Sequence, residues 1–387
     1  MSKIATPKVY GWCPGALRPM MSGDGLVVRI RAPLGRLSQD QARGVAALSQ
    51  YYGNGILEVS ARANLQMRGV TQDHHPTLIS ALQDLGLVDT DPAAEARRNV
   101  LVAPFWCAGD ETHTLARHLS NALVKATDLT LPGKFGFAVD TGPAPVLRDT
   151  AADIRIERNN DGLVLVADGA KTGLQVTMDT VVVQALTLAR WFLTHGGAPD
   201  GRGRMHPLIA RRAPPSAHGA ALAPPAPQQR LEQVAAGRLV GLEFGQIPAT
   251  DFAALANLGP LRLTPWRMLL VEHAEEIPAQ PGLILDATDP RLQVSACTGA
   301  PGCLQALSPT RQLARDLAPY VPAGSTLHVS GCTKGCARPN AAALTLTATA
   351  TDTFDLIRNG KASDRPALTN LSATTLRAAP DILTKGS

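Results

Sequence analysis

Four of the six cysteines occur as two pairs whose spacing suits metal binding. In "SACTGAPGC" five residues separate Cys297 from Cys303, and in "SGCTKGCA" three residues separate Cys332 from Cys336. Zinc modules usually carry cysteines about two to four residues apart, so the first pair is wider than the common zinc pattern. An iron–sulfur cluster is larger than one ion and takes one thiolate per iron, which suits wide loops rich in small residues. The spacing favours a cluster, with zinc and disulfides left as alternatives.

The two remaining cysteines show no such pattern. Cys107 follows "PFW" and is expected to be a small buried residue. Cys13, in "GWCPG", lies beside a turn, where packing is the default expectation and contact with a substrate or metal the alternative.

Length and composition indicate a globular chain that folds without disulfides. The chain has 387 residues, of which 45% are hydrophobic, enough for two or more cores of ordinary size. The start, "MSKIATPKVYGWCPG", lacks the apolar segment of a signal peptide, and no later stretch is apolar for the length of a membrane span. We therefore expect a soluble cytoplasmic protein, a compartment in which paired cysteines are more often ligands or redox groups than bridges.

The positive charge is moderate and dispersed. The formal net charge is +5, and Arg and Lys occur singly rather than in blocks interleaved with aromatic residues. We therefore expect neither nucleic acid nor a membrane as a partner. A polyanionic small molecule held by guanidinium groups fits the same charge, because arginine binds carboxylates through two hydrogen bonds.

Two kinds of segment recur on either side of residues 211–230, a Pro- and Ala-rich stretch with no periodic apolar face and no pairing strand. Residues 25–70 and 237–272 each predict strand, turn, amphipathic helix, loop and strand, which is half of a ferredoxin-like unit. Residues 97–170 and 291–361 each predict a strand, a helix and further strands. Because a lone half leaves a sheet edge exposed, the two halves are expected to pair into one sheet with helices on one face.

The predicted fold class is α+β, with paired ferredoxin-like halves and two α/β modules in a duplicated architecture. The expected units are a first half at 10–75, a module without a cluster at 95–210, a linker at 211–230, a second half at 231–290 and a cluster-binding module at 291–387.

The order Cys-x5-Cys, a long segment with a helix, then Cys-x3-Cys resembles the signature of the sulfite and nitrite reductase superfamily. The resemblance extends over nearly the whole chain and implies a nitrite/sulfite reductase-like fold. It also implies that Cys297, Cys303, Cys332 and Cys336 bind a 4Fe-4S cluster, with Cys336 facing the iron of any bound sirohaem.

Three cationic segments, "SARANLQMRG", "RRNV" and "LPGKF", resemble those that surround the tetrapyrrole in this superfamily. Where sulfite reductases carry a second lysine this chain has Gly136, which argues against sulfite reduction by the usual route. The resemblance implies substrate-binding roles for Arg62, Arg98 and Lys134, and more weakly for Arg68, Arg18, Arg267 and Arg338.

The segments "GWCPGALRPMMSGDGLVVRI", "LTPWR" and "ACTGAPGC" are similar to an oxygen-dependent branch of the superfamily that acts in aerobic cobalamin biosynthesis. This likeness implies a monooxygenase that hydroxylates C20 of precorrin-3A with dioxygen and closes a γ-lactone. Electrons would come from an external ferredoxin, flavodoxin or NAD(P)H-dependent reductase. The likeness leaves room for an additional non-haem iron, but no ligand set for it and no catalytic residue is recognisable in the sequence.

Three alternatives to the oxygenase are kept. A sirohaem-dependent sulfite or nitrite reductase would use the same cysteines and cations. A carrier that holds a tetrapyrrole or passes electrons without chemistry would also suit a duplicated chain with one degenerate copy. A structural zinc domain would contain zinc and no iron.

Overall fold

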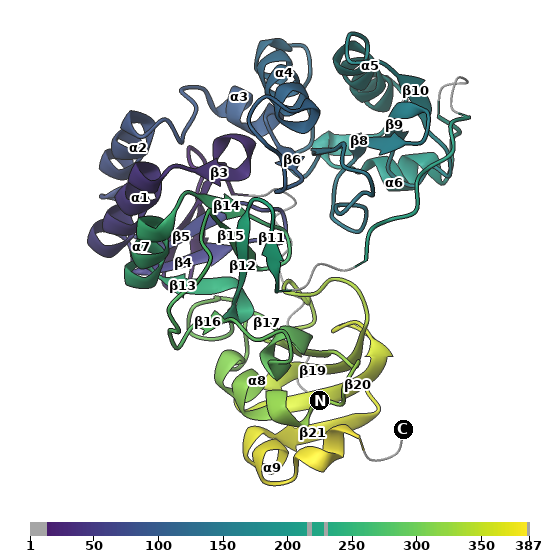
Figure 1. Ribbon diagram of the computed structural model, residues 1–387. Helices are drawn as coiled ribbons and strands as arrows, with labels where there is room; N and C mark the ends of the chain where they lie inside the picture. Colours follow the sequence, from purple (N-terminus) through teal and green to yellow (C-terminus); the bar gives the residue numbers. More distant parts are fainter. Residues whose placement is uncertain (1–13, 215–218, 228–230, 385–387) are drawn as a thin grey trace.

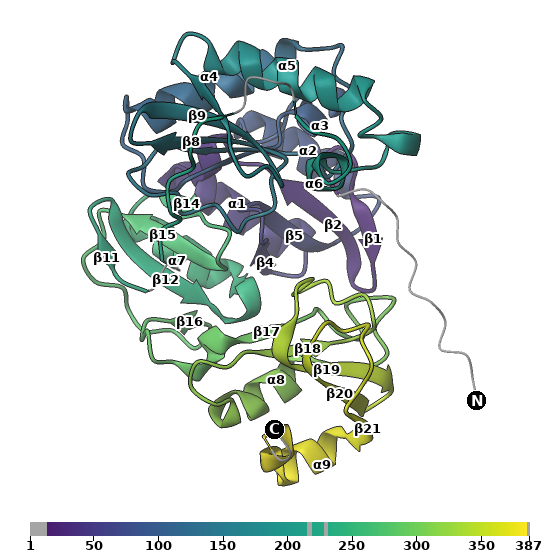
Figure 2. The same cartoon turned by 90° about the vertical axis from the view of Figure 1, so that its right-hand side faces the viewer.

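The computed structural model describes residues 14–214, 219–227 and 231–384, which form four β-sheets with flanking helices (Figure 1). The two ferredoxin-like halves lie together in the middle, with one α/β module on either side of them (Figure 2). The predicted α+β class is confirmed, whereas the domain boundaries stay predictions. Across the described ranges, no helix combines the length and apolar character needed to cross a bilayer.

The first half packs two helices beside an antiparallel sheet. Helix α1 begins at a capping box in which Ser38 and Gln41 each satisfy the other's backbone N–H. Its buried positions, Ala42, Val45, Ala46 and Ser49, recur with the helical period and face the core. The elements are β1 (Met20–Ser22), β2 (Gly25–Ile30), α1 (Gln39–Tyr52), β4 (Ile56–Val59), β5 (Leu65–Val70) and α2 (His75–Asp84).

The second half repeats this arrangement and shares its core with the first. Helix α7 packs against α1, and Leu57, Met67, Phe252 and Leu261 belong to one continuous hydrophobic cluster. The elements are β11 (Gln233–Val234), β12 (Gly237–Leu242), α7 (Ala249–Leu258), β14 (Leu261–Leu263), β15 (Met268–Glu272) and β16 (Leu283–Ile284).

The halves exchange strands. Strand β3 (Arg36–Leu37) leaves the first half to pair with β14, and β13 (Gln246–Pro248) leaves the second half to pair with β4. Both follow the same kind of turn, in which Leu34 and Phe244 each have φ 56°. The expectation of one continuous sheet is wrong: there are two sheets, β1-β2-β5-β4-β13 and β11-β12-β15-β14-β3. Each half covers the edge that the other would otherwise leave unpaired.

The two α/β modules have the same topology. Their sheets run β10-β9-β8-β7-β6 and β21-β20-β19-β18-β17, and in each the first three strands along the chain are parallel. The first module contains α3 (Pro92–Arg97), β6 (Val100–Val102), α4 (Glu111–Lys125), β7 (Phe137–Asp140), β8 (Ile154–Asn159), β9 (Gly162–Ala167), β10 (Leu174–Val176), α5 (Val181–Thr194) and α6 (Met205–Ile209). The second contains β17 (Val294–Ala296), α8 (Arg311–Leu317), β18 (Leu327–Ser330), β19 (Ala342–Ala350), β20 (Thr353–Gly360), β21 (Leu368–Ser372) and α9 (Ala373–Ala378).

The described part of the expected linker is held against the first module. Ala220 forms an antiparallel bridge with Gly173, and the Ala226 N–H donates to the carbonyl of Pro145. The described residues of this stretch nevertheless form no strand, as expected, because the Ala220 bridge is an isolated one. Residues 215–218 and 228–230 of it lie outside the described residues.

The cluster-less module holds a carboxylate at the end of its second strand, where its twin has Ser330. Asp140 is 2% exposed and accepts a hydrogen bond from the Leu147 N–H at 2.8 Å. Burial raises the pKa of Asp140 to about 6, and Glu157 raises it further, while the N–H groups of Leu147 and Val146 oppose the shift. The folded state therefore holds this proton more tightly than the unfolded chain does.

We expect Asp140→Asn to remove a pH dependence of stability. Because the folded pKa lies above the unfolded value of 3.8, the stabilisation from Asp140 is complete below 3.8 and is lost as pH rises through about 6. The loss amounts to about 3 kcal/mol of unfolding free energy. Denaturant unfolding from pH 3.5 to 7.5 measures this loss as the difference between the pH profiles of the wild type and the variant. Asp149→Asn, at an exposed neighbour, should keep the wild-type profile; an Asp140→Asn protein that also keeps it would contradict the assignment.

Candidate functional site

Two adjacent parallel strands deliver the first and third cysteines of the paired motifs. Strand β17 ends at Ala296 and Cys297 follows directly, while Cys332 lies two residues beyond the end of β18. Ala296 pairs with Val329, and the Cys297 N–H donates to the Val329 carbonyl at 3.0 Å. Because the carboxyl ends of parallel strands meet at one edge of a sheet, both cysteine loops emerge side by side.

The two loops approach too closely to admit a side chain between them. The Leu307 N–H donates to the Gly331 carbonyl at 2.8 Å, which joins one loop to the other. A Cβ added to Gly331 would lie 2.7 Å from the Cβ of Ala306. Glycine at this position therefore permits the contact. Within the first loop, the Cys303 N–H donates to the Gly299 carbonyl at 2.8 Å and closes a turn.

The Cys332 and Cys336 thiols lie close enough to the other paired cysteines for these to affect their ionisation. Burial raises the pKa of the Cys332 thiol, and Cys297 and Cys303 raise it further against the opposing effect of Lys334. Burial likewise raises the pKa of Cys336 to about 11, with the other three cysteines adding to the shift. Cys336 is nevertheless an exposed residue as a whole. Thiols in such a group ionise at neutral pH only where positive charge is supplied.

The four paired cysteines supply the four thiolates that a 4Fe-4S cluster takes, one for each iron. The described cysteines are also free of disulfides. The irons of such a cluster would supply positive charge beside Cys332 and Cys336, whose thiol pKa values are raised by burial. The four cysteines are thus suited to a 4Fe-4S cluster.

Two polar side chains of β18 contact the Cys297 thiol. The His328 Nε2 lies 3.7 Å from the Cys297 sulfur and the Ser330 hydroxyl lies 3.5 Å from it. Burial lowers the pKa of His328 to about 4, and Arg267 and Arg338 lower it further. The imidazole is therefore neutral at pH 7 and keeps one N–H, which can donate to a ligating thiolate and adjust its electronic properties.

Arg267 and Arg338 lie beside the loop that carries Cys336. A guanidinium nitrogen of Arg267 donates to the carbonyl of Ala337, and the Arg338 Nε donates to the carbonyl of Ala341 at 3.3 Å. Burial lowers the pKa of Arg267 below its usual range, while Cys297 opposes the shift. A guanidinium nevertheless stays charged in proteins, so this edge of the site is cationic.

Arg62, Lys134 and Arg98 form a second group, where the first half meets the first α/β module. A guanidinium nitrogen of Arg62 donates to the backbone carbonyl of Lys134 at 2.8 Å, and the Lys134 side chain is exposed. Arg98 lines a narrow cleft with Asn64 and forms an ion pair with Asp89 at 2.8 Å. The structure therefore brings these three predicted residues into one region, with the Arg98 charge already balanced.

The sequence matches the family model of the nitrite/sulfite reductase ferredoxin-like half domain over residues 18–85. The chain is 30% identical to a precorrin-3B synthase from Sinorhizobium sp, over 92% of this chain and 84% of that one. It belongs to the precorrin-3B synthase family. That family lies within the nitrite/sulfite reductase superfamily: a ferredoxin–nitrite reductase from Synechococcus elongatus is 26% identical over 84% of this chain and 76% of that one. Mycobacterium tuberculosis NirA protein has the same fold, with a TM-score of 0.61 and 18% identity over 92% of this chain and 79% of that one.

Two further cations predicted in this member of the precorrin-3B synthase family lie elsewhere. Arg68 is buried and forms ion pairs with Asp24 at 2.8 Å and Glu58 at 3.3 Å, so its charge is balanced within the protein. Arg18 is exposed and precedes β1. Their expected contacts with substrate stay predictions.

The expected burial of Cys107 is wrong. The residue is exposed in the turn before α4, where its N–H donates to the Asp110 carboxylate at 2.6 Å. The same carboxylate accepts from the His113 N–H and caps the helix, which holds the turn at the surface. Cys13 lies outside the described residues.

Sequence reasoning missed His328, which contacts the Cys297 thiol, and the ion pair of Glu58 with Arg311, which joins β4 to the helix after the first cysteine loop. A signal for the first was present, because the period of two in "LHVS" puts His328 and Ser330 on one face of the strand that precedes Cys332. The ion pair of Glu58 with Arg311 joins residues 253 positions apart and leaves no such local pattern.

Proposed function

We propose that this chain is an oxygen-dependent monooxygenase of cobalamin biosynthesis that converts precorrin-3A to precorrin-3B. The reaction hydroxylates C20 and closes a γ-lactone from the ring A acetate. One oxygen atom of dioxygen enters the product and the other leaves as water, with two electrons and two protons taken from an external donor. The observation that supports this most is 30% identity to a precorrin-3B synthase over 92% of the chain.

The proposed roles follow from the chemistry of each group. Cys297, Cys303, Cys332 and Cys336 would hold a 4Fe-4S cluster, which supplies electron transfer when bound. Arg62 and Lys134 would bind carboxylates on the rim of the tetrapyrrole, each well-aligned pair contributing about 1–3 kcal/mol once water is excluded. The donor would be a ferredoxin, a flavodoxin or an NAD(P)H-dependent reductase.

A sirohaem-dependent reductase is the second candidate, because a ferredoxin–nitrite reductase aligns with 84% of the chain. The space around Gly136 does not accommodate the second lysine that sulfite reductases carry at this position. A Cβ at this position would lie 2.7 Å from the amide nitrogen of Asn99, which itself donates to the Phe135 carbonyl at 2.8 Å. A lysine would therefore displace Asn99 from that hydrogen bond, and this favours the oxygenase.

Two measurements on anaerobically purified protein test the proposal. Iron and sulfide analysis with an absorption spectrum should show a broad cluster shoulder, whereas a strong Soret band with a red-shifted chlorin band would favour the reductase.

In the second measurement the protein is reduced and then exposed to precorrin-3A and ¹⁸O-labelled dioxygen. The product should carry one labelled oxygen by mass spectrometry. An unlabelled, unchanged tetrapyrrole would indicate a carrier, and zinc without iron would indicate a structural zinc domain.

We expect Lys134→Ala to weaken precorrin-3A binding by about tenfold, the loss of one partly desolvated charged hydrogen bond. The backbone carbonyl of Lys134, which anchors Arg62, is kept in this variant, so the change isolates the ammonium group. Titration of the anaerobic protein, followed by absorbance, measures the affinity. The cluster spectrum should be unchanged, because Lys134 lies in the module without the cysteine pairs.

Lys125→Ala provides the control, since Lys125 is an exposed lysine of the same module, in the last turn of α4. It should bind precorrin-3A with wild-type affinity. Bleaching of the cluster in Lys134→Ala, or equal weakening in both variants, would contradict the separate roles.

A further inference from the structure

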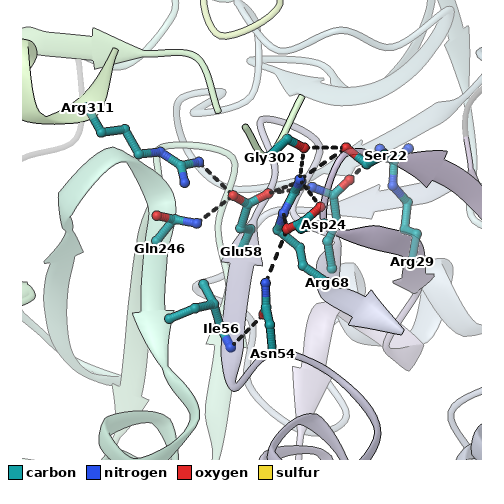
Figure 3. A network of polar contacts seen from close by, with 11 residues as sticks. Ser22, Asp24, Arg29, Asn54, Ile56, Glu58, Arg68, Gln246, Gly302 and Arg311 are labelled. Carbon is teal, nitrogen blue, oxygen red and sulfur yellow. Dashed lines mark hydrogen bonds and ion pairs between the residues drawn. The ribbon is translucent and has the colours of Figure 1, made fainter. Parts of the chain in front are cut away.

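One carbonyl in the first cysteine loop is held by three donors from the N-terminal half. The carbonyl oxygen of Gly302, the residue before Cys303, accepts from the Ser22 hydroxyl at 2.6 Å, the Gly23 N–H at 3.2 Å and the Arg68 Nη2 at 2.9 Å (Figure 3). The donors lie at the end of β1, in the turn after it and on β5, about 230 to 280 residues away along the chain. Contacts over such a separation are built by the fold and are not a local turn.

The turn and the loop meet at backbone distance. A Cβ added to Gly23 would lie 1.9 Å from the carbonyl oxygen of Pro301, closer than any real contact. Only glycine lets the β1–β2 turn lie directly on the cysteine loop.

Arg68 is committed to this contact by the groups around it. It is 5% exposed, and the Asp24 carboxylate accepts from its Nε at 2.9 Å and its Nη2 at 2.8 Å. Its Nη1 donates to Glu58 at 3.3 Å. These bonds fix the plane of the guanidinium and leave the Nη2 edge directed at Gly302, as Figure 3 shows.

Glu58 extends the same network to the far end of the loop. Its other carboxylate oxygen accepts from Arg311 at 2.6 Å and from Gln246 at 2.7 Å. Burial alone would raise the pKa of Glu58, but Arg68 and Arg311 outweigh it and hold the pKa below its usual range. Arg311 begins α8, the helix that follows the cysteine loop. The N-terminal half is thus tied both to the loop, at Gly302, and to the helix that follows it, at Arg311.

We propose that Arg68 is a positioning residue for the cysteine site, fixing the loop from Cys297 to Cys303 through the Gly302 carbonyl. Its guanidinium bridges two carboxylates and a carbonyl in one plane, which the single ammonium of lysine cannot do. The network therefore joins the module that carries the cysteine pairs to the half that carries Arg62. This inference rests on the proposed cluster but not on the proposed substrate.

Arg68→Lys in the full-length chain tests it. The wild type and the variant are loaded with iron and sulfide anaerobically, and the decay of the cluster absorbance is followed in the presence of an iron chelator. The variant should lose its cluster at least about tenfold faster, the effect of one charged hydrogen bond. Its reduced form should also show an altered electron paramagnetic resonance spectrum. Ser22→Ala removes one of the three donors, together with the hydroxyl that accepts from the Arg68 Nη2 at 3.2 Å, but leaves every ion pair intact, so it should show a smaller acceleration.

Arg262→Lys is the matched control. Arg262 is 6% exposed and bridges the Glu272 carboxylate and the backbone carbonyls of Pro104 and Trp106, and none of these belongs to a cysteine loop. It should lower the melting temperature as Arg68→Lys does, yet release the cluster at the wild-type rate. Wild-type release by Arg68→Lys and Ser22→Ala, or equal acceleration by the control, would overturn the positioning role. A wild-type protein without iron and sulfide would instead overturn the proposed cofactor.

Discussion

Replacing Cys303 with serine is expected to abolish cluster incorporation and to reduce solubility with it. The cluster needs one thiolate per iron, and a serine hydroxyl ionises far less readily than a thiol. The two cysteine loops pack on each other through Leu307 and Gly331, so losing the cluster removes the group that anchors both. Iron and sulfide per chain should fall at least about tenfold from about four of each.

Cys107→Ser is the control for that substitution. Cys107 is exposed in the module that lacks the cysteine pairs, so the same chemical change there should leave iron, sulfide and the spectrum as in wild type. A Cys303→Ser protein that retains the full cluster spectrum would remove this residue from the proposed ligand set. Equal losses in both variants would show that the effect is not specific to the paired cysteines.

Replacing Glu272 with alanine is expected to cost about 3–5 kcal/mol of unfolding free energy. Its carboxylate accepts from Arg36 on the exchanged strand β3 at 2.7 Å and from Arg262 on β14 at 2.6 Å. Glu272 and Arg262 are both buried. The alanine would leave the Arg262 charge unpaired in the interior. Arg36 would lose the bond that secures β3 to the second half.

Urea unfolding followed by circular dichroism measures this cost. Asp128→Ala removes another carboxylate–arginine pair of the same 2.7 Å length, but Asp128 and Arg190 are about half exposed. That control should change the unfolding free energy by less than about 1 kcal/mol, because water screens the pair. A Glu272→Ala cost as small as that of the control would show that the exchanged strand does not depend on this contact.

The duplicated fold and the cysteine site were accessible to sequence reasoning because both leave local patterns. The half-domains show strand and helix periodicity, and Cys297, Cys303, Cys332 and Cys336 have a distinctive spacing. The strand exchange was missed because β3 has two residues and β13 has three, too few to show an alternating pattern.

The environment of Arg68 could not be predicted for a different reason. Resemblance to a family segment indicates which cations lie near a tetrapyrrole. It does not show that the charge of Arg68 is balanced within the protein, by Asp24, 44 residues away along the chain, and by Glu58, 10 residues away. Which of many carboxylates meets a given arginine depends on strand register. Whether an ion pair is buried cannot be predicted from amino-acid composition.

The exchange of β3 and β13 also indicates how the duplication arose. The two strands follow equivalent turns and cover equivalent edges, so a single ancestral copy would have left one edge open unless a second chain covered it. Two identical chains swapping these strands would form a closed twofold dimer with two equal cysteine sites. Fusion of the genes would then free one site from selection. The result would be a single chain in which the module without the paired cysteines survives as a scaffold.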